Sequence, residues 1–185
     1  NDKDDSYLAA IYPIEKEESI SAQKIKPIDA LSVYSLKTNT ESLIRKELNK
    51  PVIFHAPSAL LIAYQQLVPP NKKNMSFVRL QQDEILITIF KNKKLQLHSS
   101  FDIENIEDAF YYYFNAIDQL GMERKTVTLN LLGNHTEIDK FNQIASANIE
   151  GSKLVNRLPT LQYDDRVFSH PTHHFFNLFA LVLCA

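Results

Sequence analysis

Three histidines near the carboxyl end form the one cluster of side chains that has the composition of a metal site. His170, His173 and His174 lie in the pentapeptide HPTHH, where His170 and His173 can share one side at the start of a helix. Neutral imidazoles are good ligands for Zn²⁺ and Ni²⁺. No cysteine is nearby, and the closest carboxylates are Asp164 and Asp165. The alternative, which we favour, is that His173 and His174 cap and pack the start of the helix.

A second set of residues has the types of a hydrolytic triad. Ser99, Ser100 and Asp102 stand close in sequence to His98. A serine nucleophile in an α/β hydrolase usually sits in a G-x-S-x-G turn, which exposes its hydroxyl above the sheet. The sequence contains no such turn, so we do not favour a serine hydrolase.

Lysines are concentrated in two short segments. The run KNKK covers residues 91–94, and Lys72 with Lys73 lies about twenty residues earlier. The formal net charge of the whole chain is −2, and its calculated pI is about 6.3. Nucleic-acid binding usually needs a broad basic face. We therefore interpret the lysines as solvated turns, and a nucleic-acid partner is not expected.

Composition indicates a water-soluble globular chain. Of 185 residues, 44% are hydrophobic and 23% charged, which suits one domain or two small lobes. The longest apolar run, FFNLFALVLCA, is shorter than the roughly 20 residues that span a bilayer. The amino-terminal segment lacks the basic and apolar regions of a signal peptide. We expect a cytoplasmic protein without a membrane partner, with its single cysteine, Cys184, buried as a small apolar side chain.

The first part of the chain is predicted to follow the order β-α-β-α. Strands are expected at 30–36 and 51–56, and Pro69 with Pro70 ends the second helix. Thr38 and Glu41 have the spacing of a capping box for the first helix, and Ser58 could cap the second.

The second part is predicted to follow the order β-β-β-α-β-α-β-α. Residues 76–100 alternate apolar and polar side chains over three runs, which is typical of an antiparallel meander. A helix is expected between Asn105 as N-cap and Gly121 as terminator, with its aromatic block FYYYF mainly in the core. The remaining expected elements are a strand at 126–132, a helix at 136–144, a strand at 152–158 and, from Thr172, a helix that is apolar all round and buried.

The two parts share an internal repeat. LKTNTES at 36–42 aligns with LGNHTEI at 132–138, with identical Leu, Thr and Glu at matching places. We therefore divide the chain into residues 1–70, the later part of a first lobe, and residues 71–185, a complete second lobe. Because the second lobe opens with a meander that the first lacks, we expect the start of the first lobe to be absent from this sequence.

This order of elements resembles the ribonuclease H-like unit, two of which form the actin-like ATPase fold. Several stretches, among them KPVIFHAPSALL, FKNKKLQLHSSF, FYYYFNAIDQLG, VTLNLLGN and the ending HPTHHFFNLFALVLCA, are similar to a Bacteroidetes family of unknown function, of the DUF3822 type. The similarity covers about residues 25–185. It implies an α/β, actin-like fold and no particular activity, so it assigns no catalytic residue.

An actin-like ATPase needs a glycine-rich turn in each meander, because side chains would keep the peptide N–H groups away from phosphate. The first turn here, LQQDEI, has no glycine and places Asp83 and Glu84 where phosphate would lie. We interpret it as a polar turn, with a Mg²⁺-binding Asp83 as the alternative. Gly133 and Asn134 follow a buried strand, where the resemblance implies a vestigial nucleotide contact.

These observations favour a catalytically degenerate actin-like protein that binds a protein partner or acts as a scaffold, with no cofactor. The alternative is an ATP-binding enzyme or switch, using ATP and Mg²⁺, whose phosphate motifs lie in the absent amino-terminal part. A nucleic-acid-associated protein is a third and weaker hypothesis.

Overall fold

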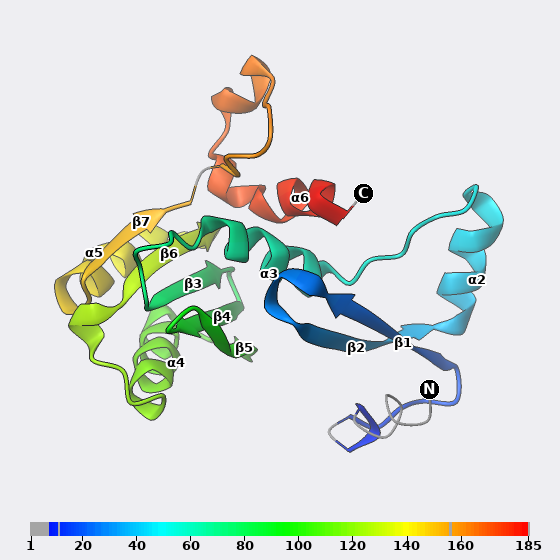
Figure 1. Cartoon of the computed structure of the whole chain (residues 1–185), viewed down its shortest axis with the longest axis horizontal. Coiled ribbons are helices and arrows are strands. Elements are labelled where there is room, and N and C mark those ends of the chain that lie inside the picture. Colours follow the sequence, from blue (N-terminus) through cyan, green and yellow to red (C-terminus); the bar gives the residue numbers. More distant parts are fainter. Residues whose placement is uncertain (1–7, 11, 156, 185) are drawn as a thin grey trace.

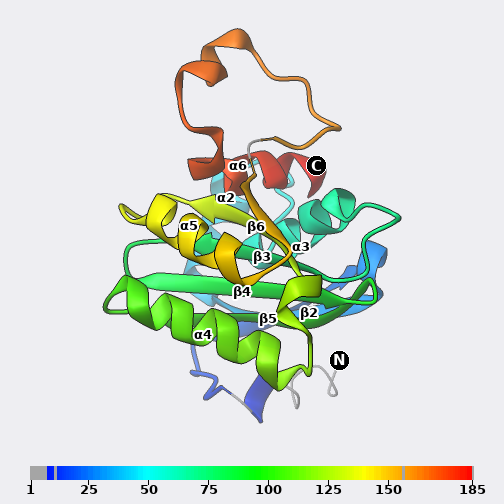
Figure 2. The same ribbon diagram turned by 90° about the vertical axis from the view of Figure 1, so that its left-hand side faces the viewer.

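A computed structural model describes residues 8–10, 12–155 and 157–184, and it contains two unequal parts (Figure 1). The larger part is a five-stranded sheet with helices on both faces, and the smaller part is a two-stranded sheet followed by a helix (Figures 1 and 2). The side chain of Cys184 lies outside the described residues, so its burial stays a prediction.

The five-stranded sheet confirms the predicted meander. Its strand order is β5-β4-β3-β6-β7, with β3, β4 and β5 antiparallel and with β6 and β7 parallel to β3. Most of the side chains of β3 and β4 are buried, since helices cover both faces of the sheet. The strands are β3 (Met75–Leu80), β4 (Glu84–Lys91), β5 (Lys94–Asp102), β6 (Thr128–Gly133) and β7 (Gly151–Leu154).

Helices α4 (Ile106–Gln119) and α5 (Ile138–Asn148) cover one face of this sheet. The predicted N-cap is confirmed, because the Asn105 side chain accepts a hydrogen bond from the Asp108 amide and a complete capping box forms. The aromatic block also packs as predicted: Tyr113 is fully buried, whereas Tyr111 is 65% exposed.

Helices α3 (Ala56–Leu67) and α6 (Phe176–Leu181) cover the opposite face. The ring of Tyr64 on α3 stacks on Phe77 of β3, with 4.3 Å between ring centroids. The predicted cap at Ser58 is wrong. Helix α3 begins two residues earlier, with Pro57 in its first turn, where a missing N–H costs no hydrogen bond.

The smaller part differs from the predicted order. Strand β1 (Glu18–Ile25) lies before the first strand predicted from the sequence. It pairs antiparallel with β2 (Ala30–Lys37), and a 3-10 turn, η1 (Lys26–Ile28), joins them. The predicted strand at 51–56 is not formed. Residues 51–55 pair with no described strand, and Val52 is 80% exposed. The order is therefore β-β-α-α, and the shared part of the repeat is a strand followed by a helix.

The capping box predicted at the start of α2 (Thr38–Glu47) does not form. The Thr38 hydroxyl donates instead to the carbonyl oxygen of Glu17, 2.8 Å away, and the Glu41 carboxylate accepts from the Ser19 hydroxyl at 2.8 Å. Both partners belong to β1 or the residue before it. Contacts distant in sequence have replaced the local cap.

The carboxyl-terminal segment is only partly buried. It comprises three 3-10 turns, Asp165–Ser169, Thr172–His174 and Val182–Cys184, around the short helix α6. Phe176 and Ala180 are buried, but Leu178 is 62% exposed, so the prediction of a helix buried all round is wrong. One face of α6 packs against α3 and the sheet, and the other faces outward. No helix within the described ranges has the length and apolar character to cross a bilayer.

Candidate functional site

The carboxyl edge of the large sheet is the candidate functional site. Strands β3, β5, β6 and β7 run in the same direction, so their carboxyl ends meet at this edge. In open α/β sheets, ligands bind in the crevice outside these ends. The turn between β3 and β4 and the loops that lead into α4 and α5 lie here, together with Gly133 and Asn134.

Gly133 occupies a position that only glycine can fill. Its φ is +116°, and a Cβ atom would lie 2.0 Å from the carbonyl oxygen of Leu80 on the neighbouring strand. The amides of Asn134 and His135 both donate to that same oxygen, at 3.1 and 3.3 Å. Close approach of β6 to β3 therefore explains the glycine. The Leu80 carbonyl oxygen also takes the hydrogen bonds of the Asn134 and His135 N–H groups, which a nucleotide contact at Asn134 would use.

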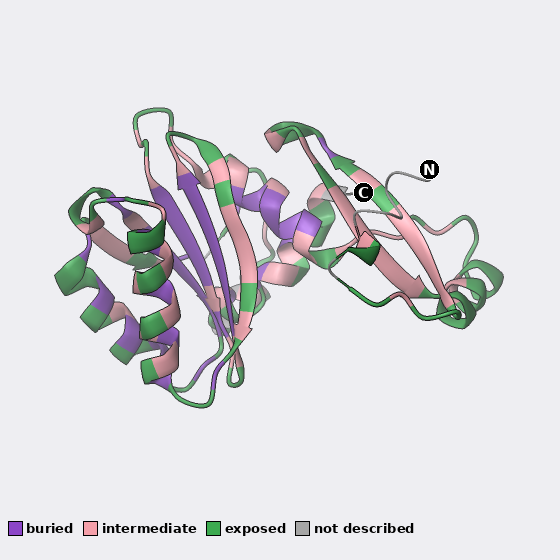
Figure 3. Ribbon diagram, turned by 90° about the horizontal axis from the view of Figure 1, so that it is seen from below, coloured by how far each residue is buried: buried purple, intermediate pink, exposed green. Residues whose placement is uncertain are grey.

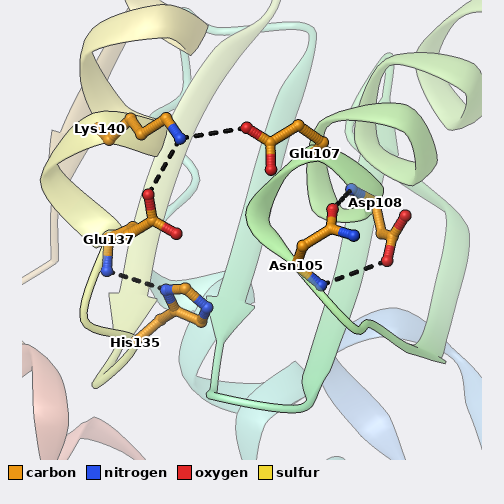
Figure 4. Close-up of polar contacts among 6 residues, drawn as sticks. All are labelled: Asn105, Glu107, Asp108, His135, Glu137 and Lys140. Atoms are coloured by element: carbon orange, nitrogen blue, oxygen red, sulfur yellow. Dashed lines mark hydrogen bonds and ion pairs between the residues drawn. The ribbon is translucent and has the colours of Figure 1, made fainter.

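His135 is a residue of this edge that sequence reasoning did not single out. It is buried, and its Nδ1 accepts a hydrogen bond from the Glu137 amide at 2.9 Å (Figure 4). An accepting Nδ1 places the proton of the neutral ring on Nε2. Its position in LLGNHTE, directly after a buried strand, is the signal that could have indicated it.

Charged side chains tie the starts of the two helices together. The Lys140 ammonium contacts the carboxylates of Glu137 and Glu107, at 3.0 and 3.1 Å, and so joins α5 to α4 (Figure 4). The hydrogen bonds that Lys140 donates, to Glu137 with the larger effect and then to Glu107, raise the pKa of Lys140. The hydrogen bond from Lys140 lowers the pKa of Glu107.

The amino end of α4 is already occupied by groups of the protein. The Asp108 carboxylate accepts from the amides of Glu104 and Asn105 at 2.9 and 3.3 Å, and the Asn105 side chain accepts from the Asp108 amide at 3.0 Å. A helix amino terminus attracts anions because its first N–H groups are free. Here protein oxygens accept from the Asp108 amide and from the amides of the two residues before the helix, Glu104 and Asn105.

The turn between β3 and β4 contains no glycine. Its backbone is held by hydrogen bonds from the Gln81 amide to the Glu84 carbonyl and from the Ile103 amide to the Asp83 carbonyl. Glu84 forms an ion pair with Arg79. The exposed Asp83 carboxylate has no described ion-pair partner, so the edge carries negative charge at this turn.

Two of the three histidines of HPTHH contact each other, and the third contacts Phe175. His173 and His174 meet edge to face, with 4.5 Å between ring centroids, while the ring of His170 is directed toward Phe175. Burial lowers the pKa of His173, and the neighbouring His174 lowers it further. Asp139 acts in the opposite direction. In the described ranges, no three His, Cys, Asp or Glu side chains are grouped to hold a metal ion.

His98 is not assembled with a serine nucleophile. Its Nδ1 lies 2.8 Å from the hydroxyl of Thr88 on the adjacent strand β4. Burial, then the nearby His55 and Arg79, lowers the pKa of His98 to about 4. Ser99 follows it on the same strand, where successive side chains point to opposite faces.

Two of the lysines noted in the sequence have structural partners. Lys72 forms an ion pair with Glu150, and the Lys91 ammonium donates to the carbonyl oxygen of Leu120 at the end of α4. They hold together turns at one end of the sheet.

Comparison with solved structures defines the class. A Bacteroides thetaiotaomicron VPI-5482 protein, described as having an actin-like ATPase fold and unknown function, superimposes with a TM-score of 0.80 at 14% identity. The alignment covers 100% of this chain and 66% of that one. The protein thus has the actin-like ATPase fold and spans about two thirds of that relative. A member of the Ppx/GppA family from Aquifex aeolicus aligns over 45% of this chain and 35% of its own, with a TM-score of 0.30 and 15% identity.

The chain belongs to the family described as protein of unknown function (DUF3822), whose model matches residues 1–150. The resemblance inferred from its sequence motifs is therefore confirmed. No curated protein matches the sequence.

Proposed function

We propose that this member of the family is an actin-like module that binds a protein partner and does not hydrolyse nucleotide. One observation carries the proposal. At the edge where an α/β sheet binds its ligand, five backbone N–H groups already donate to oxygens of the protein, namely those of Asn134, His135, Glu104, Asn105 and Asp108.

Electrostatics at this edge also oppose a nucleotide. Two negative charges about 5 Å apart repel by roughly 3 kcal/mol at an effective dielectric constant of about 20. A phosphate chain would meet the carboxylates of Asp83, Glu104 and Asp108, while the nearby cations Arg79 and Lys140 are paired with glutamates. Neither Arg79 nor Lys140 is therefore free to neutralise a phosphate, which opposes nucleotide binding at this edge.

Free strand edges support binding of a protein. Strand β5 is nine residues long and forms one edge of the large sheet. The hairpin of β1 and β2 pairs with no other strand in the described chain, and it shows mainly half-buried and exposed residues (Figure 3). An unpaired edge can accept an extended segment of another protein as an additional strand. We assign this role to β5.

Amide-resolved NMR of the full-length protein tests the nucleotide part of the proposal. We expect 5 mM Mg-ATP to leave the amides of Asn134, His135 and residues 81–83 unshifted, and ATP to remain intact. Saturable shifts at these amides, or hydrolysis of ATP, would instead support the alternative, an ATP-binding enzyme or switch that uses phosphate motifs outside residues 1–185.

Site-specific photo-crosslinking in cells tests the protein-binding part. A benzoylphenylalanine in place of Ser100, on the free edge strand, is expected to give a discrete adduct with another protein. The same group in place of Tyr111, exposed on the outer face of α4, is the control and should give none. Adducts that are absent at Ser100, or identical at both positions, would contradict a role for β5.

A further inference from the structure

A cavity of about 550 Å³ lies at the end of the large sheet opposite Gly133, beside the amino ends of strands β3 and β6. Its walls are the turn between β1 and β2, the turn between β4 and β5, and Gln65 near the end of α3. Its volume is within the roughly 300–1,000 Å³ typical of small-molecule pockets. Because the two turns belong to the small and the large part of the fold, a ligand here would contact both.

The cavity has a charge opposite to that of the chain as a whole. Lys26, Lys93 and Lys94 line it, and Asp29 is its single acidic residue. Asp29 is itself 3.6 Å from Lys24 at the rim. No carboxylate among the described residues forms an ion pair with Lys26, Lys93 or Lys94. The chain has a net charge of −2, so this local excess of ammonium groups is a specific feature of the cavity.

The turn that carries two of these lysines has a defined shape. Asn92 and Lys93 have φ angles of +51° and +67°, as in a two-residue hairpin turn. The Lys93 amide donates to the Lys73 carbonyl at 3.0 Å, and the Asn92 amide donates to the Asn74 side chain at 3.3 Å. The backbone therefore holds this turn in place without a ligand.

One wall of the cavity contains a buried polar group without a partner. The side-chain Oε1 of Gln65 is inaccessible to solvent and has no hydrogen bond. Because this oxygen is closed off from solvent, it does not itself face the open space of the cavity. The adjacent Ile28 and Leu95 are half-buried apolar side chains that pack against the core. The cavity thus combines three cations with an apolar wall.

We propose that this cavity binds a small phosphorylated molecule. Its phosphate would lie among the ammonium groups of Lys26, Lys93 and Lys94. The sugar ring or base of the ligand would lie against Ile28 and Leu95. Sugar phosphates and nucleotides share this chemistry, and the experiment below separates them.

Isothermal titration calorimetry of the full-length protein tests the proposal, with AMP, glucose 6-phosphate and inorganic phosphate as probes. We expect AMP or glucose 6-phosphate to bind with a Kd below about 1 mM, and adenosine and glucose not to bind. AMP alone would identify a nucleotide site, and glucose 6-phosphate alone a sugar-phosphate site. Failure of both esters, or equally tight binding of inorganic phosphate, would overturn the proposal.

Lysine variants test whether the phosphate esters bind in this cavity. The double variant Lys93→Gln/Lys94→Gln should weaken ester binding at least tenfold, whereas Lys46→Gln/Lys153→Gln, which removes two lysines elsewhere, should not. Unchanged affinity in the first variant, or equal losses in both, would refute the assignment. A shift of the Asn134 amide signal on addition of Mg-ATP would contradict the proposed function, but it would not change the binding results for this cavity.

Discussion

Replacement of Gly133 by alanine tests whether that glycine is explained by strand packing. The added Cβ would lie 2.0 Å from the Leu80 carbonyl oxygen and 2.7 Å from its carbon, so the two strands must separate. A non-glycine residue at a φ of +116° costs about 1–3 kcal/mol. Loss of the hydrogen bonds from Asn134 and His135 to Leu80 adds about 1 kcal/mol each.

The expected total loss for Gly133→Ala is about 3–5 kcal/mol in the free energy of unfolding. For a chain of this length each kcal/mol lowers Tm by about 2–4 °C, which gives a decrease of roughly 6–20 °C. Urea denaturation followed by far-ultraviolet circular dichroism measures the free energy. An unchanged m value would show that the comparison concerns the same transition.

The other two glycines provide matched controls. Gly121 has a φ of +59° and nothing within 4 Å of a built Cβ, so Gly121→Ala should cost only about 1–2 kcal/mol. Gly151 also has open space and an ordinary φ, and Gly151→Ala should be within about 1 kcal/mol of the wild type. If Gly133→Ala is no less stable than Gly121→Ala, strand packing does not explain Gly133, and a ligand contact becomes the better explanation.

Three further predictions concern single side chains. Because folding lowers the pKa of His98 from 6.5 to about 4, only the unfolded chain gains a proton there between these pH values. The wild type should therefore lose about 3 kcal/mol more stability than His98→Gln between pH 7 and pH 4 in urea titrations, and parallel pH profiles would refute this. Asn105→Ala should lower the free energy of unfolding by about 1 kcal/mol because it removes a formed cap, while Thr38→Ala should cost less; equal losses would contradict the cap assignment. Tyr113→Phe should cost about 1–3 kcal/mol because it leaves the buried Ser76 hydroxyl, now 2.8 Å from the phenol oxygen, without its partner. A double variant that also carries Ser76→Ala should lose less than the sum of the single losses, and strict additivity would refute the coupling.

Local patterns predicted the second part of the chain well. The alternation of residues 76–100 indicated three strands because the side chains of a strand alternate between two faces, whatever pairs with it. The helical spacing from Ile106 and the N-cap at Asn105 were equally local, and both are confirmed. The order of these elements was sufficient to predict the fold class.

Elements that depend on distant partners were predicted poorly. Strand β1 is mostly half-buried and has little apolar periodicity, so pairing with β2 decides that it is a strand. The apolar segment at 51–55 has no strand to pair with and is not one. Thr38 and Glu41 have the same capping signal as the start of α4, but Glu17 and Ser19 take their hydrogen bonds.

The sequence alone determined that the first turn of the meander has no glycine and contains the acidic pair Asp83 and Glu84, because both features follow directly from residue types. It could not show why Gly133 is a glycine, since the reason is the carbonyl of Leu80, a residue 53 positions earlier. Nor could it bring Lys26 to the same cavity as Lys93 and Lys94. Only packing of the hairpin and the sheet on α3 sets these distances, because side chains remote in sequence meet where the buried faces of their elements fit together.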